Sequence, residues 1–155
     1  MSDPQRAAFL AMVQKHLVDT VPHNHAIGMK LVELGVDSCR FTIPYSEALV
    51  GNPETGVMHG GVITAFIDAA CGAAVIAALK GLRRVATLDL RIDYMRPAAP
   101  RREITCHARC YRLTKNVAFT RAEAYLDTPE ELVATAAGTF AIFDEPATAR
   151  KEAQK

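Results

Sequence analysis

Residues 55–79 of the chain read TGVMHGGVITAFIDAACGAAVIAAL, and this stretch decides the fold. One His and two glycines, His59, Gly60 and Gly61, open a long apolar segment that holds a single carboxylate, Asp68. An acid surrounded by apolar residues does not serve solubility, and its burial costs several kcal/mol unless another group compensates the charge. The rest of the chain must therefore explain why Asp68 is there.

The apolar segment predicts a helix with two unlike faces. At 100° per residue, larger side chains lie opposite Asp68, and small residues flank the carboxylate. The far face comprises Val62, Ile63, Phe66, Ala70, Ala73 and Ala77. The segment is long enough to cross a membrane. Amphipathic strands after it and the central acid favour instead a helix wrapped by its own antiparallel sheet.

Strand patterns occupy both sides of this helix. Residues 27–45 predict two strands around a turn, and four strand-like runs follow Gly81 as far as about Phe143. Short links between the last three runs are typical of antiparallel hairpins. The first run alternates apolar and polar residues, which predicts one buried face. That apolar face comprises Ala86, Leu88, Leu90, Ile92 and Tyr94.

An amphipathic helix with Leu10, Val13 and Leu17 on one stripe opens the chain. The fold class expected is therefore α+β, an antiparallel sheet around a long central helix with a short N-terminal helix. We expect a single domain over residues 1–145, followed by a frayed polar tail over residues 146–155.

Composition limits the partners. Among 155 residues, 18 Lys and Arg nearly balance 17 Asp and Glu, so no global charge draws the protein to nucleic acid or an anionic membrane. The first residues lack the pattern of a secretory signal, and we expect a cytoplasmic protein with reduced cysteines. Cys106 and Cys110 would lie about 13 Å apart on a strand, too far to share a zinc ion. His16, His23 and His25 lack partners at ligand spacing, so we expect no metal and no cofactor.

The start of the central helix suits acyl chemistry. Two glycines let a substrate approach the backbone closely, and the unpaired N–H of Gly60 suits a carbonyl oxygen that becomes negative. Asp68 can activate water or attack the carbonyl itself. Two structural alternatives stay open: Asp68 is a buried acid satisfied by Thr64 and its neighbours, or the glycines serve only close packing.

The spacing of the two groups has a further consequence. Gly60 and Asp68 are eight residues apart, about 12 Å along one helix, too far for both to touch the same carbonyl. If both act in one reaction, they come from different chains across a two-fold axis.

The run TGVMHGGVITAFIDAACG, followed by TLDLRIDYMRP and NVAFTRAEAY, resembles the hotdog-fold acyl-CoA thioesterases of the phenylacetic-acid-degradation type. The likeness covers roughly residues 27–143 and includes the nine-residue spacing from His59 to Asp68. It implies a hotdog fold, hydrolysis of acyl-CoA to free acid and CoA, and paired subunits that form a homodimer and then a homotetramer.

The resemblance also implies roles for other residues. Asn52 corresponds to an Asn that positions water or the thioester, although it lies seven residues before His59 where the family has six. Thr87 matches a Ser or Thr that hydrogen-bonds the acid or the water. Because side chains alternate along a strand, Thr87 is expected on the face opposite Leu88 and Leu90. It can hydrogen-bond Asp68 only where the local strand geometry or the other subunit brings it there. His59 is a further catalytic candidate, but because Asp68 already supplies a base, we expect His59 instead to brace the loop by hydrogen bonds.

The acyl group is expected along the apolar surface near the helix start, at Val57, Met58, Gly61, Ile63 and Phe66. A local basic surplus near strand ends supplies candidates for the CoA phosphates: Arg83, Arg84, Arg91, Arg96, Arg101, Arg102 and Lys115. Two other functions stay open, a hotdog dehydratase or hydratase acting on acyl thioesters and a non-catalytic acyl-ligand binding module.

Overall fold

The computed structural model describes residues 3–146. Its helices are α1 (Asp3–Gln14), α2 (Pro22–Ala26) and α3 (Gly60–Leu79), with a π-helical turn at Lys15–Asp19 and a 3-10 turn at Glu47–Leu49. Its strands are β1 (Lys30–Leu34), β2 (Ser38–Ile43), β3 (Val50–Asn52), β4 (Val57–Met58), β5 (Arg83–Tyr94), β6 (Ile104–Leu113), β7 (Val117–Tyr125) and β8 (Leu132–Pro146). The tail expected after residue 145 lies almost wholly outside the described residues.

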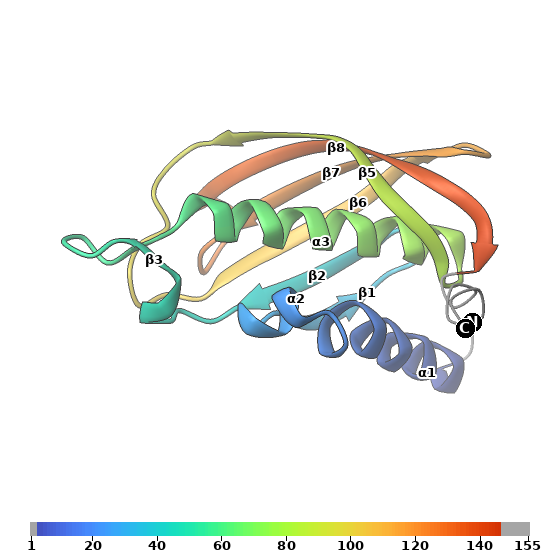
Figure 1. Ribbon diagram of the computed structural model, residues 1–155, viewed down its shortest axis with the longest axis horizontal. Helices are drawn as coiled ribbons and strands as arrows, with labels where there is room; N and C mark the ends of the chain where they lie inside the picture. The colour runs from blue at the N-terminus through green and yellow to red at the C-terminus, as the bar shows by residue number, and fades with distance from the viewer. Residues whose placement is uncertain (1–2, 147–155) are drawn as a thin grey trace, which may run out of the picture.

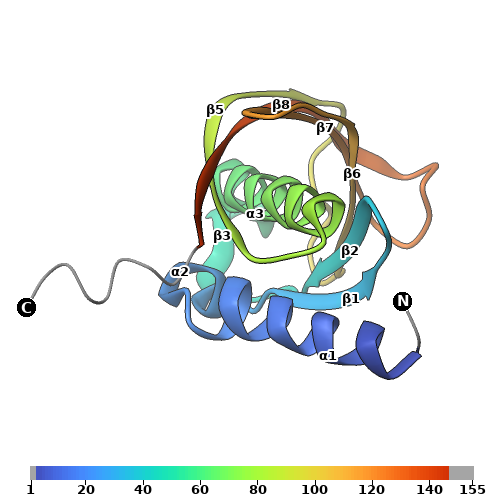
Figure 2. The ribbon, with the colours of Figure 1, turned by 90° about the vertical axis from the view of Figure 1, so that its right-hand side faces the viewer.

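Six strands form one antiparallel sheet in the order β1-β2-β6-β7-β8-β5. The sheet curls around α3, which lies along its concave side (Figures 1 and 2). The α+β fold with a wrapped central helix is therefore confirmed. Because β5 pairs with β8 and not with its neighbour in sequence, β5 and β1 are the two edges of the sheet.

The expected far face of α3 is the face that packs against the sheet. Ile63, Phe66, Ala70, Ala73 and Ala77 are buried, and Val62 is partly buried. α3 is the one described helix long and apolar enough to cross a membrane, and 56% of its most apolar window is buried inside the molecule. Its apolar character is thus explained by the sheet around it.

The expected buried face of β5 is wrong at three of its five residues, since Ala86, Leu88 and Tyr94 are exposed. The pairing with β8 shifts between Thr87, opposite Phe140, and Asp89, opposite Thr139, which leaves Leu88 unpaired in a β-bulge. Leu88 is 61% exposed, and Ala86 is exposed as well. A bulge resets the side-chain alternation, so Thr87 before it and Leu90 after it both lie on the side of α3.

Two further segments differ from a simple reading of the sequence. The expected loop before α3 contains a short hairpin, β3 and β4. The N-terminal stripe is buried at Val13 and partly buried at Leu10 and Leu17, but the helix passes into a π-helical turn. In both views the N-terminal helices lie on the side of α3 that the sheet leaves open (Figures 1 and 2).

Candidate active site

α3 begins at a tightly held backbone turn. His59 is the N-cap of the helix, and its Nδ1 accepts a hydrogen bond from the Gly61 N–H at 2.9 Å. The Val62 N–H donates to the His59 carbonyl. A Cβ on Gly61 would lie 2.9 Å from His59 Nδ1, so this glycine lets the imidazole fold over the helix start. His59 thus braces the turn, as the sequence predicted.

The Gly60 N–H differs from its neighbours. It has no hydrogen-bond partner within the part of the chain that the structure describes, and Gly60 is exposed. Its carbonyl, in contrast, accepts from the Tyr94 hydroxyl at 2.7 Å and faces the Thr64 hydroxyl at 3.1 Å. An unpaired N–H at a helix N-terminus, with the positive end of the helix dipole behind it, can bind a developing oxyanion.

An apolar cavity of about 420 Å³ opens beside this turn; we call it the helix-start cavity. Its lining comprises Val57, Met58, Gly60, Ile63, Tyr94, Met95, Arg96, Pro97 and Ala98. Three of the residues expected to contact an acyl group, Val57, Met58 and Ile63, are therefore together. Phe66 is completely buried in the core and Gly61 is not part of this lining, so the structure does not bring these two to the cavity.

Asp68 lies in a second cavity, of about 160 Å³, which we call the Asp68 cavity. Thr87 Oγ1 donates a hydrogen bond to Asp68 Oδ1 at 2.8 Å, within one chain. The β-bulge supplies the strand geometry that this contact requires. Asp68 is partly exposed, so it is less desolvated than the surrounding apolar sequence suggested. Thr64, the partner expected from a purely structural acid, contacts Tyr94 and Gly60 instead.

The N-terminal segment also reaches the Asp68 cavity, which the sequence did not predict. Leu17 and Asn24 line it, and Asn24 Nδ2 donates to the Leu17 carbonyl at 2.6 Å. Besides Asp68 and Thr87, Asn24 is the only polar side chain in the lining. No local pattern around Asn24 points to α3, because the contact depends on how the N-terminal helices pack.

Asn52 has a visible structural role. Its Oδ1 accepts from the Glu54 N–H at 3.0 Å, and its carbonyl accepts from the Thr55 and Gly56 N–H groups, so it closes the β3–β4 turn. Asn52 lines neither the helix-start cavity nor the Asp68 cavity. Those two cavities share no lining residue, so within one chain the Gly60 N–H and the Asp68 carboxylate face separate spaces.

The cysteines take no part in these cavities. All four are free and buried. Burial raises the pKa of Cys71 to about 12, and it raises the pKa values of Cys39 and Cys106 as well. Among the described residues no group of three His, Cys, Asp or Glu side chains is placed to hold a metal ion.

Comparison with known proteins identifies the class. Residues 55–133 match the model of the thioesterase superfamily. The medium/long-chain acyl-CoA thioesterase YigI of Escherichia coli K12 is 29% identical over 147 residues, which cover 86% of this chain and 93% of that protein. A crystal structure from Pseudomonas aeruginosa is 39% identical, with a TM-score of 0.77 over 85% of this chain and 98% of that one.

The PaaI protein of the E. coli phenylacetic acid degradation operon shares the fold, with a TM-score of 0.77 over 91% of this chain and 96% of that one at 16% identity. The chain therefore belongs to the thioesterase superfamily and is a hotdog-fold thioester hydrolase. The resemblance seen in the sequence is confirmed at the level of family and fold.

Proposed function

We propose that the protein hydrolyses acyl-CoA thioesters to a free acid and CoA, with the Gly60 N–H as oxyanion donor and Asp68 as base or nucleophile. One observation carries the proposal. α3 starts with an unpaired N–H beside an apolar cavity and, eight residues later, carries a partly exposed carboxylate fixed by Thr87. A thioesterase needs these two elements, one to stabilise the tetrahedral oxyanion and one to deliver the oxygen.

Two routes fit the carboxylate. As a base, Asp68 takes a proton from water as the water oxygen bonds to the thioester carbon; the C–S bond then breaks and the CoA thiolate takes up a proton. As a nucleophile, Asp68 forms an acyl anhydride with loss of CoA thiolate, and water then hydrolyses the anhydride. In both, negative charge develops on the carbonyl oxygen, where the Gly60 N–H stabilises it.

The acyl chain belongs in the helix-start cavity. Apart from Arg96 and the Tyr94 hydroxyl, its lining is apolar side chains and backbone, and about 420 Å³ lies within the range of small-molecule sites. YigI is named for medium and long acyl chains. We therefore expect longer aliphatic acyl groups to be better substrates than acetyl.

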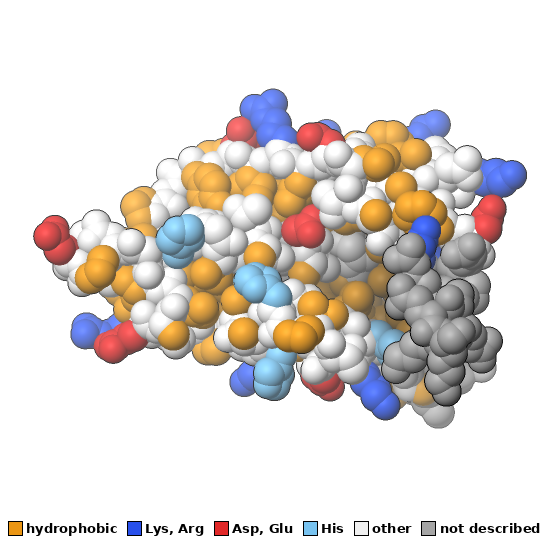
Figure 3. Space-filling model, viewed as in Figure 1, with side chains coloured by type: hydrophobic (Ala, Val, Ile, Leu, Met, Phe, Trp, Pro, Cys, Tyr) orange, Lys and Arg blue, Asp and Glu red, His pale blue; other side chains and the backbone are white. Residues whose placement is uncertain are grey.

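A complete site requires two chains. The rise of about 12 Å between Gly60 and Asp68 keeps them apart within one helix. β5 is a 12-residue edge strand, and Leu88, Tyr94 and Met95 on or next to it are largely exposed. On the face seen in Figure 3, charged side chains lie mostly at the margin and apolar ones are spread across the centre. An open strand edge beside exposed apolar side chains suits pairing with a second copy.

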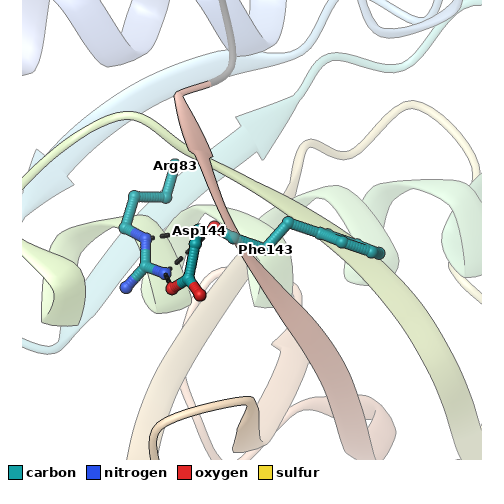
Figure 4. A network of polar contacts seen from close by, with 3 residues as sticks. All are labelled: Arg83, Phe143 and Asp144. Atoms are coloured by element: carbon teal, nitrogen blue, oxygen red, sulfur yellow. Dashed lines mark hydrogen bonds and ion pairs between the residues drawn. The ribbon is translucent and has the colours of Figure 1, made fainter.

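Most candidate cations for the CoA phosphates are already engaged. Arg83 binds the Asp144 carboxylate and the Phe143 carbonyl, as Figure 4 shows. Arg84 lies 4.0 Å over the Phe143 ring. Arg91 pairs with Asp93, and Arg102 pairs with Asp127 and Glu131.

Two arginines near the helix start are different. Arg96 lines the helix-start cavity and Arg101 a neighbouring polar cavity, and neither forms a salt bridge with a described residue. We therefore place the CoA phosphates at Arg96 and Arg101 in preference to the other arginines.

The proposal is tested by thiol release from a panel of acyl-CoAs. Asp68→Asn is nearly isosteric at a partly exposed position, so it should fold but lose at least about a hundredfold in kcat. Thr87→Ser keeps the hydroxyl and is the matched control. Near-normal turnover by Asp68→Asn contradicts the assignment. Water addition to an enoyl-CoA without thioester hydrolysis identifies a hydratase, and binding without turnover a binding module.

A second measurement separates the two routes. In a single turnover in oxygen-18 water, a nucleophilic Asp68 acquires label when the anhydride is hydrolysed at the enzyme carbonyl, whereas a general base leaves the protein unlabelled.

A further inference from the structure

Tyr94 contacts the first turn of α3 from the end of β5. Its hydroxyl donates to the Gly60 carbonyl at 2.7 Å and lies 2.8 Å from Thr64 Oγ1. Each hydroxyl has one proton, so the Thr64 proton goes either to the Tyr94 oxygen or to the Gly60 carbonyl, 3.1 Å away. The three groups form one small network on one backbone oxygen.

That oxygen belongs to the peptide between Gly60 and Gly61. The N–H of the same peptide donates to His59 Nδ1. The peptide is therefore held at both ends, its carbonyl by Tyr94 and its N–H by His59. The preceding peptide is fixed at its carbonyl, where the His59 oxygen accepts from the Val62 N–H. One polar group of this turn is left over, the Gly60 N–H.

Two glycines in succession make this restraint necessary. Glycine has a wide choice of backbone conformations, and a Gly-Gly peptide at a fraying helix end rotates unless other groups fix it. An oxyanion donor is effective only when it points in advance at the position of the developing charge. Tyr94 is the nearest side chain to this glycine, because a Cβ on Gly60 would lie 3.5 Å from the Tyr94 hydroxyl oxygen and 3.7 to 3.9 Å from two of its ring carbons.

We propose that Tyr94 is a positioning residue that, with Thr64 and His59, locks the Gly60–Gly61 peptide so that the Gly60 N–H alone is presented to the thioester oxygen. The inference rests on the proposed role of the Gly60 N–H. It also assigns a different role to Gly61, whose N–H is occupied by His59 and whose missing side chain makes room for the imidazole.

The test is Tyr94→Phe, which keeps the ring that lines the helix-start cavity and removes only the hydroxyl. We expect kcat to fall about tenfold, less than the hundredfold or more for loss of an oxyanion donor itself, with KM nearly unchanged. Tyr111→Phe is the matched control, since Tyr111 lies far along β6 and is 52% exposed. Thr64→Val should lower kcat by a smaller factor, and Thr64→Ser should restore it.

A readout independent of activity is amide exchange at Gly61. Tyr94→Phe removes the hydrogen bond to the Gly60 carbonyl, so the hydrogen of the Gly61 amide should exchange with solvent about fivefold faster in this variant. In Tyr111→Phe it should exchange at the wild-type rate. Should Tyr94→Phe fail to fold, Thr64→Val tests the same carbonyl by both readouts.

The outcomes are distinct. Unchanged kcat in Tyr94→Phe overturns the inference, and so does a raised KM with normal kcat, which would make Tyr94 only a wall of the acyl cavity. If Gly60→Leu, which places a bulky side chain beside the Gly60 N–H, also has normal kinetics, the oxyanion role of this N–H is refuted as well. If only Tyr94→Phe is normal, the proposed function stands without this residue. If the wild-type protein hydrolyses no acyl-CoA, unchanged Gly61 exchange in Tyr94→Phe still overturns the lock.

Discussion

Complementation between two inactive variants tests whether each site is shared by two chains. Asp68→Asn removes the carboxylate, and Gly60→Leu places a bulky side chain at the helix start, where a Cβ alone would already lie 3.5 Å from the Tyr94 hydroxyl. Homodimers of either variant contain two defective sites. A mixed dimer with shared sites contains one site with both defects and one site with neither.

The expected recovery follows from counting. At an equal mixture about half the dimers are mixed and half of their sites are intact, so activity should return to about a quarter of the wild-type value. The geometric basis is the rise of about 12 Å over eight helical residues, together with two cavities that share no lining residue. Sites confined to one chain would give no recovery at any ratio.

The assay is release of CoA thiol, followed with a thiol reagent after exchange of subunits by mild denaturation and refolding. The buried cysteines of the protein, with their raised pKa values, contribute little background. A mixture of Asp68→Asn with Asp68→Ala is the matched control and should stay inactive. Gly81→Ala, where a Cβ has no neighbour within 4 Å, controls for a glycine change in itself. Failure to recover activity in heterodimers verified by mass spectrometry would refute the shared site.

Two further predictions concern the helix start and pH. His59→Ala removes the N-cap acceptor and should lower the free energy of unfolding by about 1 kcal/mol in urea titrations. His59→Asn keeps an acceptor and should lower the free energy of unfolding much less. Equal decreases in the two variants would show that the cap does not stabilise the helix. The hydrogen bond from Arg102 lowers the pKa of Glu131 below its ordinary value of 4.5. The stabilisation that the Arg102–Glu131 pair gives the folded protein is therefore complete above the pKa of Glu131 in the unfolded state, and it is lost as the pH falls through the pKa of Glu131 in the folded state. Glu131→Gln should thus be less stable than wild type at pH 7, and the two stabilities should converge in acid. A difference in stability that persists at low pH would show that it does not come from the Glu131 charge.

The sequence predicted the central helix and the strands around it because these depend on local periodicity. The residues opposite Asp68 are all apolar and include the largest side chains of the helix start, and that pattern alone indicates which face of α3 packs on the sheet. The glycines after His59 and the single acid nine residues later likewise indicated a helix N-terminus and a carboxylate. Their spacing along one helix follows from helix geometry and needs no tertiary structure.

The surroundings of these groups depended on tertiary structure. Alternation placed Thr87 away from Leu90, but the bulge at Leu88 brings Thr87 to Asp68; its position depends on the pairing with β8, more than 45 residues later in the chain. Tyr94 was expected only as an apolar residue of a strand, yet its hydroxyl holds the Gly60 carbonyl.

Asn24 reaches the Asp68 cavity only through the docking of the N-terminal helices. A sequence pattern reports which face a side chain takes within its own helix or strand. The β-bulge and the long-range packing that bring these side chains together form only when the helices and strands contact one another. Local periodicity therefore cannot predict them.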